Sequence, residues 1–294
     1  ITPTKMKKDN YTIILFYKFT KIKNPENFKI RQKKLAEAFN LKGRMLIAKE
    51  GVNATFEGLT KNAKGYMRAF SQEKRFKDVI FKQSQGTGNS FTKLKVKVRP
   101  EVVTLGVGEL NVKKDTAPAI TASQLEKMYR KGEQFVVLDL RNDFEVQAGH
   151  FEKTVNPKLR NFRDLPAKIG ELEYLKNQKV VAVCTGGIRC EKATVLFKQK
   201  GFGNMHQLKD GIHAYMEKYP GKHFKGSLFV FDNRMVTDVK HSDVREVTGK
   251  CFDCGSFCED FYNDDSVRPS LKTLCCDVCI KKHPELRSCI SAYN

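Results

Sequence analysis

The chain has 294 residues, 40% of them hydrophobic and 30% charged, which fits a globular protein long enough for two domains with a real core. No apolar stretch is long enough to cross a bilayer and no secretory signal opens the chain, so we expect a cytoplasmic protein and neither a membrane-spanning nor a secreted one. The excess of 54 Lys and Arg over 33 Asp and Glu, a net charge of +21, is either a solvated lysine-rich surface or the mark of a polyanionic partner such as nucleic acid.

Alternating strand and helix patterns predict an α+β domain over residues 1–105. In chain order we expect a strand over 11–17, a helix that opens at Asn24-Pro25-Glu26, strands over 45–48 and 52–56, a helix over 62–70 and a last strand over 94–98. The order β-α-β-β-α-β is that of a ferredoxin-like unit.

Basic side chains alternate along the last of these strands. Successive strand residues point to opposite faces, so Lys93, Lys95, Lys97 and Arg99 point to one face, which suits phosphates better than a core. We therefore expect RNA binding there. Further charges lie elsewhere in the chain, at Lys5, Lys7, Lys8, Lys158, Arg160 and Arg163. No aromatic platform of the RNP type is present, so base stacking is not predicted.

A second domain is predicted over residues 119–221, after a linker at 106–118 with Gly106, Gly108 and Pro118. A helix follows the linker, with Ser123 expected as its N-cap. Apolar strands over 135–140 and 180–183 each precede a loop and a helix. This pattern indicates an α/β domain with a parallel sheet and helices on both faces.

The loop after the second of these strands carries a candidate nucleophile. It reads Cys184-Thr185-Gly186-Gly187-Ile188-Arg189. Inward-pointing N–H groups at a helix N-terminus stabilise an anion, and glycines permit the tight curl. We expect Cys184 and Arg189 to be catalytic, with Thr185, Gly186, Gly187 and Ile188 forming a cradle that lowers the pKa of the thiol.

The size of this loop favours sulfur over phosphate. Cysteine phosphatases use C-x5-R, whereas the spacing here is C-x4-R, which suits a single sulfur atom. The alternative is a buried structural cysteine before a glycine turn. Cys190 is either a relay thiol or a small residue that packs the first helical turn. His150 is either a general base or a local hydrogen-bonding residue.

Residues 222–294 form a cysteine-rich tail with few large apolar residues. Two C-x2-C knuckles, Cys251 with Cys254 and Cys276 with Cys279, predict a structural zinc site with four thiolates. Cys275 can replace Cys276, and Cys258, Cys289 and His283 are spare candidates. Disulfides and the absence of any ligation are the alternatives.

Four segments resemble a rhodanese domain. They are Asp139-Leu140-Arg141, Gly149-His150-Phe151, the loop from Cys184 to Arg189, and Gln207-Leu208-Lys209-Asp210-Gly211-Ile212. The resemblance implies that Cys184 carries a persulfide. It also implies that Asp139 and Arg141 form a structural pair near the loop.

Motifs over 49–55, 97–106 and 184–193 resemble the bacterial tRNA uridine-34 hydroxylase family. The resemblance implies an acylphosphatase-like N-terminal domain, a rhodanese domain and a cysteine-rich C-terminus. It further implies oxygen-dependent formation of 5-hydroxyuridine at the wobble position, with molecular oxygen as co-substrate and the tRNA anticodon arm as partner. No flavin-binding or nucleotide-binding motif is seen.

Three functions are consistent with these patterns. The leading hypothesis is a tRNA-modifying hydroxylase that uses Cys184. The second is a sulfurtransferase that moves sulfane sulfur through a Cys184 persulfide, and the third is a non-catalytic RNA-binding module. The sequence carries no signal for a particular oligomeric state.

Overall fold

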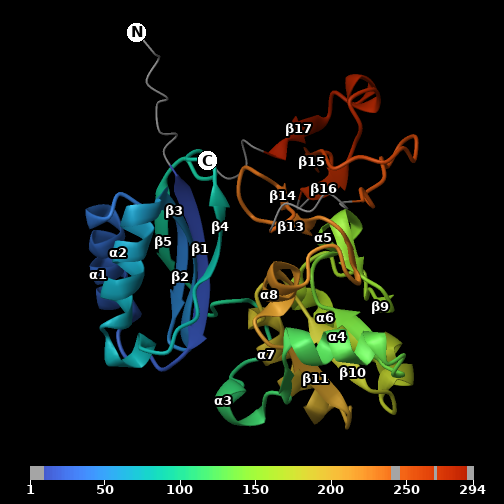
Figure 1. Cartoon of the computed structure of the whole chain (residues 1–294), viewed down its shortest axis with the longest axis horizontal. Coiled ribbons are helices and arrows are strands. Elements are labelled where there is room, and N and C mark those ends of the chain that lie inside the picture. Colours follow the sequence, from blue (N-terminus) through green and yellow to red (C-terminus); the bar gives the residue numbers. More distant parts are fainter. Residues whose placement is uncertain (1–9, 240–245, 268–269, 290–294) are drawn as a thin grey trace. The chain divides into compact units, whose positions relative to one another are not determined.

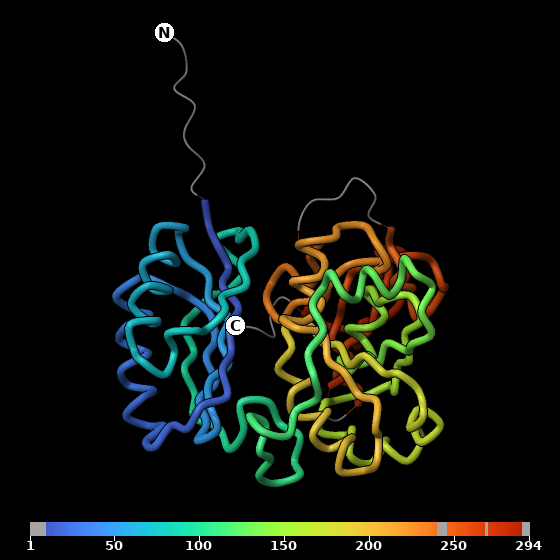
Figure 2. The backbone as a smooth tube through the Cα atoms, turned by 60° about the horizontal axis from the view of Figure 1, so that its bottom comes forward, coloured from blue at the N-terminus to red at the C-terminus, as the bar shows by residue number. Residues whose placement is uncertain are grey.

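The computed structural model describes residues 10–239, 246–267 and 270–289. It separates into two compact units, one ending at Val102 and the other beginning at Val103 (Figures 1 and 2). Within the described residues, none of the helices combines the length and the apolar character needed to span a membrane.

The first unit is a five-stranded sheet with two helices on one face (Figure 1). Its elements are β1 (Tyr11–Phe19), α1 (Pro25–Ala38), β2 (Lys42–Ala48), β3 (Gly51–Leu59), α2 (Thr60–Ser71), the 3-10 turn η1 (Lys74–Phe76), β4 (Lys82–Gly86) and β5 (Leu94–Val98). The strand order is β4-β1-β3-β2-β5, and only the pair β2 and β5 is parallel. The predicted α+β class is confirmed.

The prediction that the strand over 94–98 is the last strand of the β-α-β-β-α-β order is wrong. Residues 94–98 do form a strand, but β5 is an additional edge strand beside β2. The fourth strand of the β-α-β-β-α-β order is β4, which pairs with β1 in the register Leu15 to Lys82. The sequence of β4, KQSQG, has no apolar alternation because it lies at the other edge of the sheet, so it gave no strand signal.

The second unit contains the predicted parallel sheet. Its strands are β6 (Ala119–Ile120), β7 (Val136–Asp139), β9 (Thr154–Val155), β10 (Val180–Val183) and β11 (Met205–Leu208), in the order β6-β11-β10-β7-β9. In β10, Val180 and Ala182 enter one hydrophobic core while Val181 and Val183 enter the other. The strand is apolar throughout because both faces of the sheet are covered.

Helices cover both faces of this sheet. The helical elements are α3 (Val112–Asp115), α4 (Ala122–Arg130), α5 (Asp143–Ala148), η2 (Phe162–Asp164), α6 (Leu165–Lys168), η3 (Ile169–Leu175), α7 (Ile188–Gln199) and α8 (Gly211–Lys218). One core contains residues of α4 and α8, and the other contains residues of α6, η3 and α7.

Two local expectations are refined by these helices. The N-cap of α4 is Thr121 and not Ser123, because Thr121 forms a reciprocal capping box with Gln124. Residues 106–118 contain α3 and are held against α7, where the Thr194 hydroxyl accepts a hydrogen bond from the backbone N–H of Ala117.

The tail forms short strands around a cysteine-rich core. Its strands are β12 (Phe224–Gly226), β13 (Leu228–Phe229), β14 (Val236–Thr237), β15 (Phe261–Asp264), β16 (Leu271–Leu274) and β17 (Leu286–Ser288), with the 3-10 turn η4 (Cys279–Lys282) before β17. Strand β8 (Gly149–Phe151) precedes the tail and follows α5 directly. Strand β12 pairs with β8, and β15 pairs with β16 and β17. Five of the ten buried residues of the tail core are cysteines.

Candidate active site and metal site

The cradle lies between the end of β10 and the start of α7. Cys184 follows β10 directly, and Gly187 is the residue before the first turn of α7. Gly187, but not Gly186, has a positive φ, of 102°. This conformation, which glycine adopts without strain, turns the Gly187 N–H toward the Cys184 sulfur at 3.1 Å.

The start of α8 fixes the cradle from the other side. The N–H groups of Ile212 and His213 donate to the carbonyls of Cys184 and Thr185, each at 3.0 Å. Gly211 allows this approach, because a Cβ there would lie 2.6 Å from both carbonyl oxygens. In the sequence Gly211 is part of the motif over residues 207–212, which does not indicate this packing role.

The environment of Cys184 stabilises a thiolate. Burial alone raises the pKa of this thiol, since it is fully enclosed. The hydrogen bond from Cys190, the charge of Arg189 and the N–H groups at the start of α7 oppose burial and lower the pKa to about 6. Cys184 is therefore mainly ionised at neutral pH, as a nucleophile or a persulfide carrier requires.

Cys190 is buried in the first turn of α7, in the same core as Cys184. Burial and the hydrogen bond to Cys184 raise the pKa of Cys190 well above that of an ordinary thiol. It is therefore a protonated donor to the Cys184 sulfur. At this position the Cys190 side chain packs in the core and also lies close enough to hydrogen-bond the Cys184 sulfur.

Arg189 is held by a glutamate that the sequence did not reveal. Its two terminal nitrogens donate to the two carboxylate oxygens of Glu145 at 2.6 and 2.9 Å. Glu145 is fully buried at the start of α5, where it also accepts the backbone N–H of Asn142. The spacing from Asn142 to Glu145 is a capping-box signal, which predicts a helix start but not an ion pair 44 residues away.

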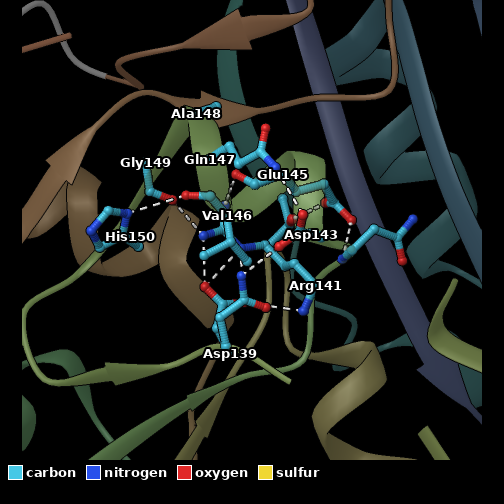
Figure 3. Close-up of polar contacts among 12 residues, drawn as sticks. Asp139, Arg141, Asp143, Glu145, Val146, Gln147, Ala148, Gly149 and His150 are labelled. Atoms are coloured by element: carbon cyan, nitrogen blue, oxygen red, sulfur yellow. Dashed lines mark hydrogen bonds and ion pairs between the residues drawn. The ribbon is translucent and has the colours of Figure 1, made fainter. Parts of the chain in front are cut away.

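Asp139 and Arg141 form a second, fully buried ion pair that contacts the backbone of α5 (Figure 3). Arg141 binds the Asp139 carboxylate at 2.7 Å and donates to the carbonyls of Glu145 at 3.2 Å and Gly149 at 2.6 Å. His150 lies 3.2 Å from the carbonyl of Val146 through Nδ1 (Figure 3). This contact holds the end of α5 and favours a local structural role for His150.

The geometry of the cradle suits a single sulfur atom. Two of the five N–H donors of Arg189 are directed at Glu145, which fixes the guanidinium beside the loop. The N–H of Gly187 already points at the Cys184 sulfur. The cradle therefore offers a positive charge and backbone N–H groups to a sulfur anion.

The structure brings the four predicted zinc ligands together. The sulfur atoms of Cys251, Cys254, Cys276 and Cys279 all lie within 4.8 Å of one another. The sulfurs of Cys254 and Cys276 are 3.7 Å apart. Zinc–sulfur bonds of about 2.3 Å in a tetrahedron put ligand sulfurs about 3.8 Å apart, so four thiolates here fit zinc.

The remaining tail cysteines lie outside this set. Cys258, Cys275 and Cys289 are buried, and none of them belongs to the four-sulfur group. All nine cysteines of the chain are unbridged. The candidate cluster is therefore the two C-x2-C knuckles themselves, and Cys275 does not replace Cys276.

The basic strand β5 presents its charges on the face opposite the two helices. Val96 of β5 enters the helix-covered core, so Lys93, Lys95 and Lys97 point the other way. Arg44 of β2 lies in register with Lys95. Partial burial, and then the charges of Lys93, Lys97 and Arg44, lower the pKa of Lys95.

The other predicted basic residues do not extend this stripe within β5. Arg99 is exposed just beyond its end, and Lys158, Arg160 and Arg163 are exposed on the second unit. Lys5, Lys7 and Lys8 lie outside the described residues.

A cleft of about 780 Å³ in the first unit is also basic. Lys21, Lys23, Arg31 and Arg75 are among its lining residues. Glu73 pairs with Arg75 and lies 3.9 Å from Arg31, so part of this charge is neutralised. The stripe on β5 is therefore the stronger candidate for phosphate contact.

Three family models match consecutive parts of the chain. A UPF0176 acylphosphatase-like domain matches residues 11–102, a rhodanese-like domain matches residues 121–218, and a rhodanese C-terminal domain matches residues 225–292. The predicted succession of an acylphosphatase-like domain, a rhodanese domain and a cysteine-rich region is thereby confirmed.

Three known proteins that are similar to this chain carry the same name. Those from Corynebacterium kroppenstedtii (39% identity, 92% of this chain and 94% of the relative), Rhodococcus opacus (38%, 91% and 96%) and Onion yellows phytoplasma (33%, 97% and 93%) are each called tRNA uridine(34) hydroxylase. The similarity thus extends over nearly the full length of both partners.

Proposed function

This chain belongs to the tRNA uridine(34) hydroxylase family, and we propose that it hydroxylates uridine 34 of tRNA with Cys184 as its reactive group. The observation that carries the proposal is the thiolate cradle at Cys184, within a chain that matches such relatives almost end to end. The reaction replaces the hydrogen at C5 of the uracil with a hydroxyl group.

Molecular oxygen is the co-substrate in this proposal. One oxygen atom enters at C5 and the other leaves as water, so an external two-electron reductant must supply two electrons, together with two protons, for each uridine. A low-pKa thiolate can carry an oxidised sulfur, either as a sulfenate or as a persulfide. Arg189 and the cradle N–H groups would stabilise its negative charge.

The anticodon arm of tRNA is the proposed partner. Its wobble base is unpaired, which permits capture of a splayed nucleotide by a pocket. The stripe of Lys93, Lys95 and Lys97 supplies the positive charge that phosphate contact needs. A tRNA substrate is consistent with the expected cytoplasmic location, which stays part of this proposal.

Zinc is the proposed metal of the tail. Four thiolates leave no open coordination position, so the ion supplies structure and not catalysis. A small core in which half of the residues are cysteines needs such a staple.

The test of the function is the modification state of tRNA in the source organism. Deleting the gene should remove 5-hydroxyuridine and its derivatives from position 34, as measured by mass spectrometry of digested tRNA. Re-expressing the chain under ¹⁸O₂ should restore the nucleoside with one heavy oxygen. An unchanged tRNA after deletion would reject the proposed substrate, and an unlabelled product would reject oxygen as the donor.

Sulfur transfer is the rival function, because residues 121–218 match a rhodanese-like domain and the cradle suits a persulfide. Incubation with thiosulfate and cyanide separates the two. Rapid thiocyanate release that depends on Cys184, together with unaltered tRNA in the deletion strain, would favour the sulfurtransferase.

A further inference from the structure

We propose that the four-cysteine site acts on Cys184 at a distance: by holding the tail against α5, it fixes the Glu145–Arg189 ion pair beside the reactive thiol. This inference depends on the tail binding zinc, as proposed above, but not on the identity of the reaction. In this proposal the metal stabilises the fold of the tail and also fixes the position of residues in the active site.

One face of α5 is part of the tail core. Ala148 is buried in that core, and the ring of Phe144 packs against it. The centroid of Phe144 lies 4.9 Å from that of Phe229, 6.3 Å from that of Phe231 and 6.4 Å from that of Phe261. The tail therefore packs against α5 through edge-to-face contacts between aromatic rings.

Each of the two C-x2-C knuckles directly follows a segment of the chain that contacts α5. Thr248, three residues before Cys251, donates its hydroxyl to the carbonyl of Ala148 at 3.0 Å. Strand β16 contacts α5 and ends at Leu274, two residues before Cys276. A metal that joins the two knuckles thus joins two segments that brace α5.

The next residue of α5 belongs to the active site. Glu145 follows Phe144 directly, and its carboxylate holds Arg189 through two hydrogen bonds. The helix has only six residues, so it has little stability of its own and depends on packing for its position. Movement of Phe144 would therefore move Glu145.

Loss of the Glu145–Arg189 ion pair would raise the pKa of Cys184. Arg189 is almost fully buried, and a buried guanidinium without its carboxylate is costly. Released from Glu145, Arg189 would turn toward solvent and away from the sulfur. Of the groups around the thiol, Cys190 would remain a donor and Asp139 would remain paired with Arg141. The pKa of Cys184 would then rise from about 6.

The experiment measures how fast Cys184 reacts with iodoacetamide at each pH, resolved by peptide mass spectrometry so that tail cysteines are scored separately. The full-length protein is compared with and without zinc, with metal content checked by elemental analysis. Loss of zinc should raise the midpoint of the Cys184 profile by about one pH unit or more, which is about a tenfold loss of thiolate at pH values well below the original midpoint.

Three variants sharpen this test. Cys254→Ser, at an exposed ligand, should raise the midpoint with its zinc reduced, and Phe144→Ala should raise it with zinc retained. Val278→Ala, in the second knuckle between Cys276 and Cys279 but 70% exposed, should leave the midpoint unchanged. A midpoint that stays near pH 6 after verified metal loss, or a chain that takes up no zinc, would overturn the proposal.

A double-mutant cycle distinguishes positioning from unfolding. In Glu145→Gln protein the link to Arg189 is already weakened, so zinc removal should shift the midpoint much less than in the natural chain. Equal shifts in both backgrounds would mean that metal loss acts by another route. No tRNA enters these measurements, so their failure would leave the proposed hydroxylation untouched.

Discussion

Cys184 is ionised because hydrogen-bond donors and a cation outweigh the cost of its burial. The N–H of Gly187, the thiol of Cys190 and the charge of Arg189 all favour the thiolate. Since only the thiolate reacts with alkylating agents, the rate should rise tenfold per pH unit up to about pH 6 and stay level above it. An ordinary exposed thiol would reach its plateau near pH 8.5.

The hydrogen bond from Cys190 can be tested separately. Cys190→Ala removes the donor, and a hydrogen bond to a charged group contributes about 1.5–3 kcal/mol, so the pKa of Cys184 should rise by about one to two units. Cys190→Ser keeps a donor of similar size and should shift it much less. The iodoacetamide profile at Cys184 measures both, and identical profiles for the two variants would show that Cys190 only fills space.

At the scale of single residues, the sequence predicts chemistry that is local along the chain. Cys184, Gly187 and Arg189 lie within six positions, so their loop and helix start can be derived together. Glu145 and Gly211 are distant in sequence, and nothing in the pattern around them indicates an ion pair with Arg189 or a carbonyl contact with Cys184.

At the scale of elements, two helix starts meet at the cradle. The first turn of α7 supplies N–H groups and Arg189, while the first turn of α8 binds the carbonyls of Cys184 and Thr185. The cradle is therefore held on its backbone from both sides. This arrangement keeps the loop preorganised for an anion before any substrate arrives.

Gly211 and Gly201 provide a matched pair for testing the contact between α8 and the loop. Both have a positive φ, of 73° and 86°, but only at Gly211 would a Cβ meet other atoms. Gly201→Ala should cost about 1 kcal/mol from backbone strain, and Gly211→Ala about 3 kcal/mol or more because the loop must move as well. Urea unfolding measures both. Equal losses would show that the close approach is unimportant.

Prediction of the elements succeeded where burial leaves a pattern. Strand β10 is apolar on both faces, and its position and parallel pairing follow from that run. Strand β4 is polar because it is an edge strand, so only pairing with β1 reveals it. The N-cap of α4 was misplaced because Thr121 and Ser123 are both good caps, and the reciprocal bond with Gln124 decides between them.

At the scale of the whole molecule, the chain has a net charge of +21, and some of its cations lie close together on and beside β5. The neighbouring cations contribute to lowering the pKa of Lys95, so an anion beside the stripe would relieve their repulsion. A stripe of this kind should contribute to tRNA binding in a manner that depends on salt.

Charge reversal on the stripe tests this expectation. Lys95→Glu with Lys97→Glu should weaken tRNA binding at least tenfold and reduce the salt slope, because each lost phosphate contact removes about 0.9 from that slope. Lys61→Glu with Lys64→Glu changes the net charge equally on α2, which covers the opposite face of the sheet. Filter binding over a range of salt compares them, and equal losses in the two pairs would mean that β5 has no special role.

The role of Cys184 as the reactive group of a tRNA hydroxylase can be measured in a strain that lacks the gene and expresses either the natural chain or Cys184→Ala at matched levels. Mass spectrometry of its tRNA should find 5-hydroxyuridine at position 34 with the natural chain and none above the deletion background with Cys184→Ala. Full modification by the Cys184→Ala protein would show that Cys184 is not the reactive group.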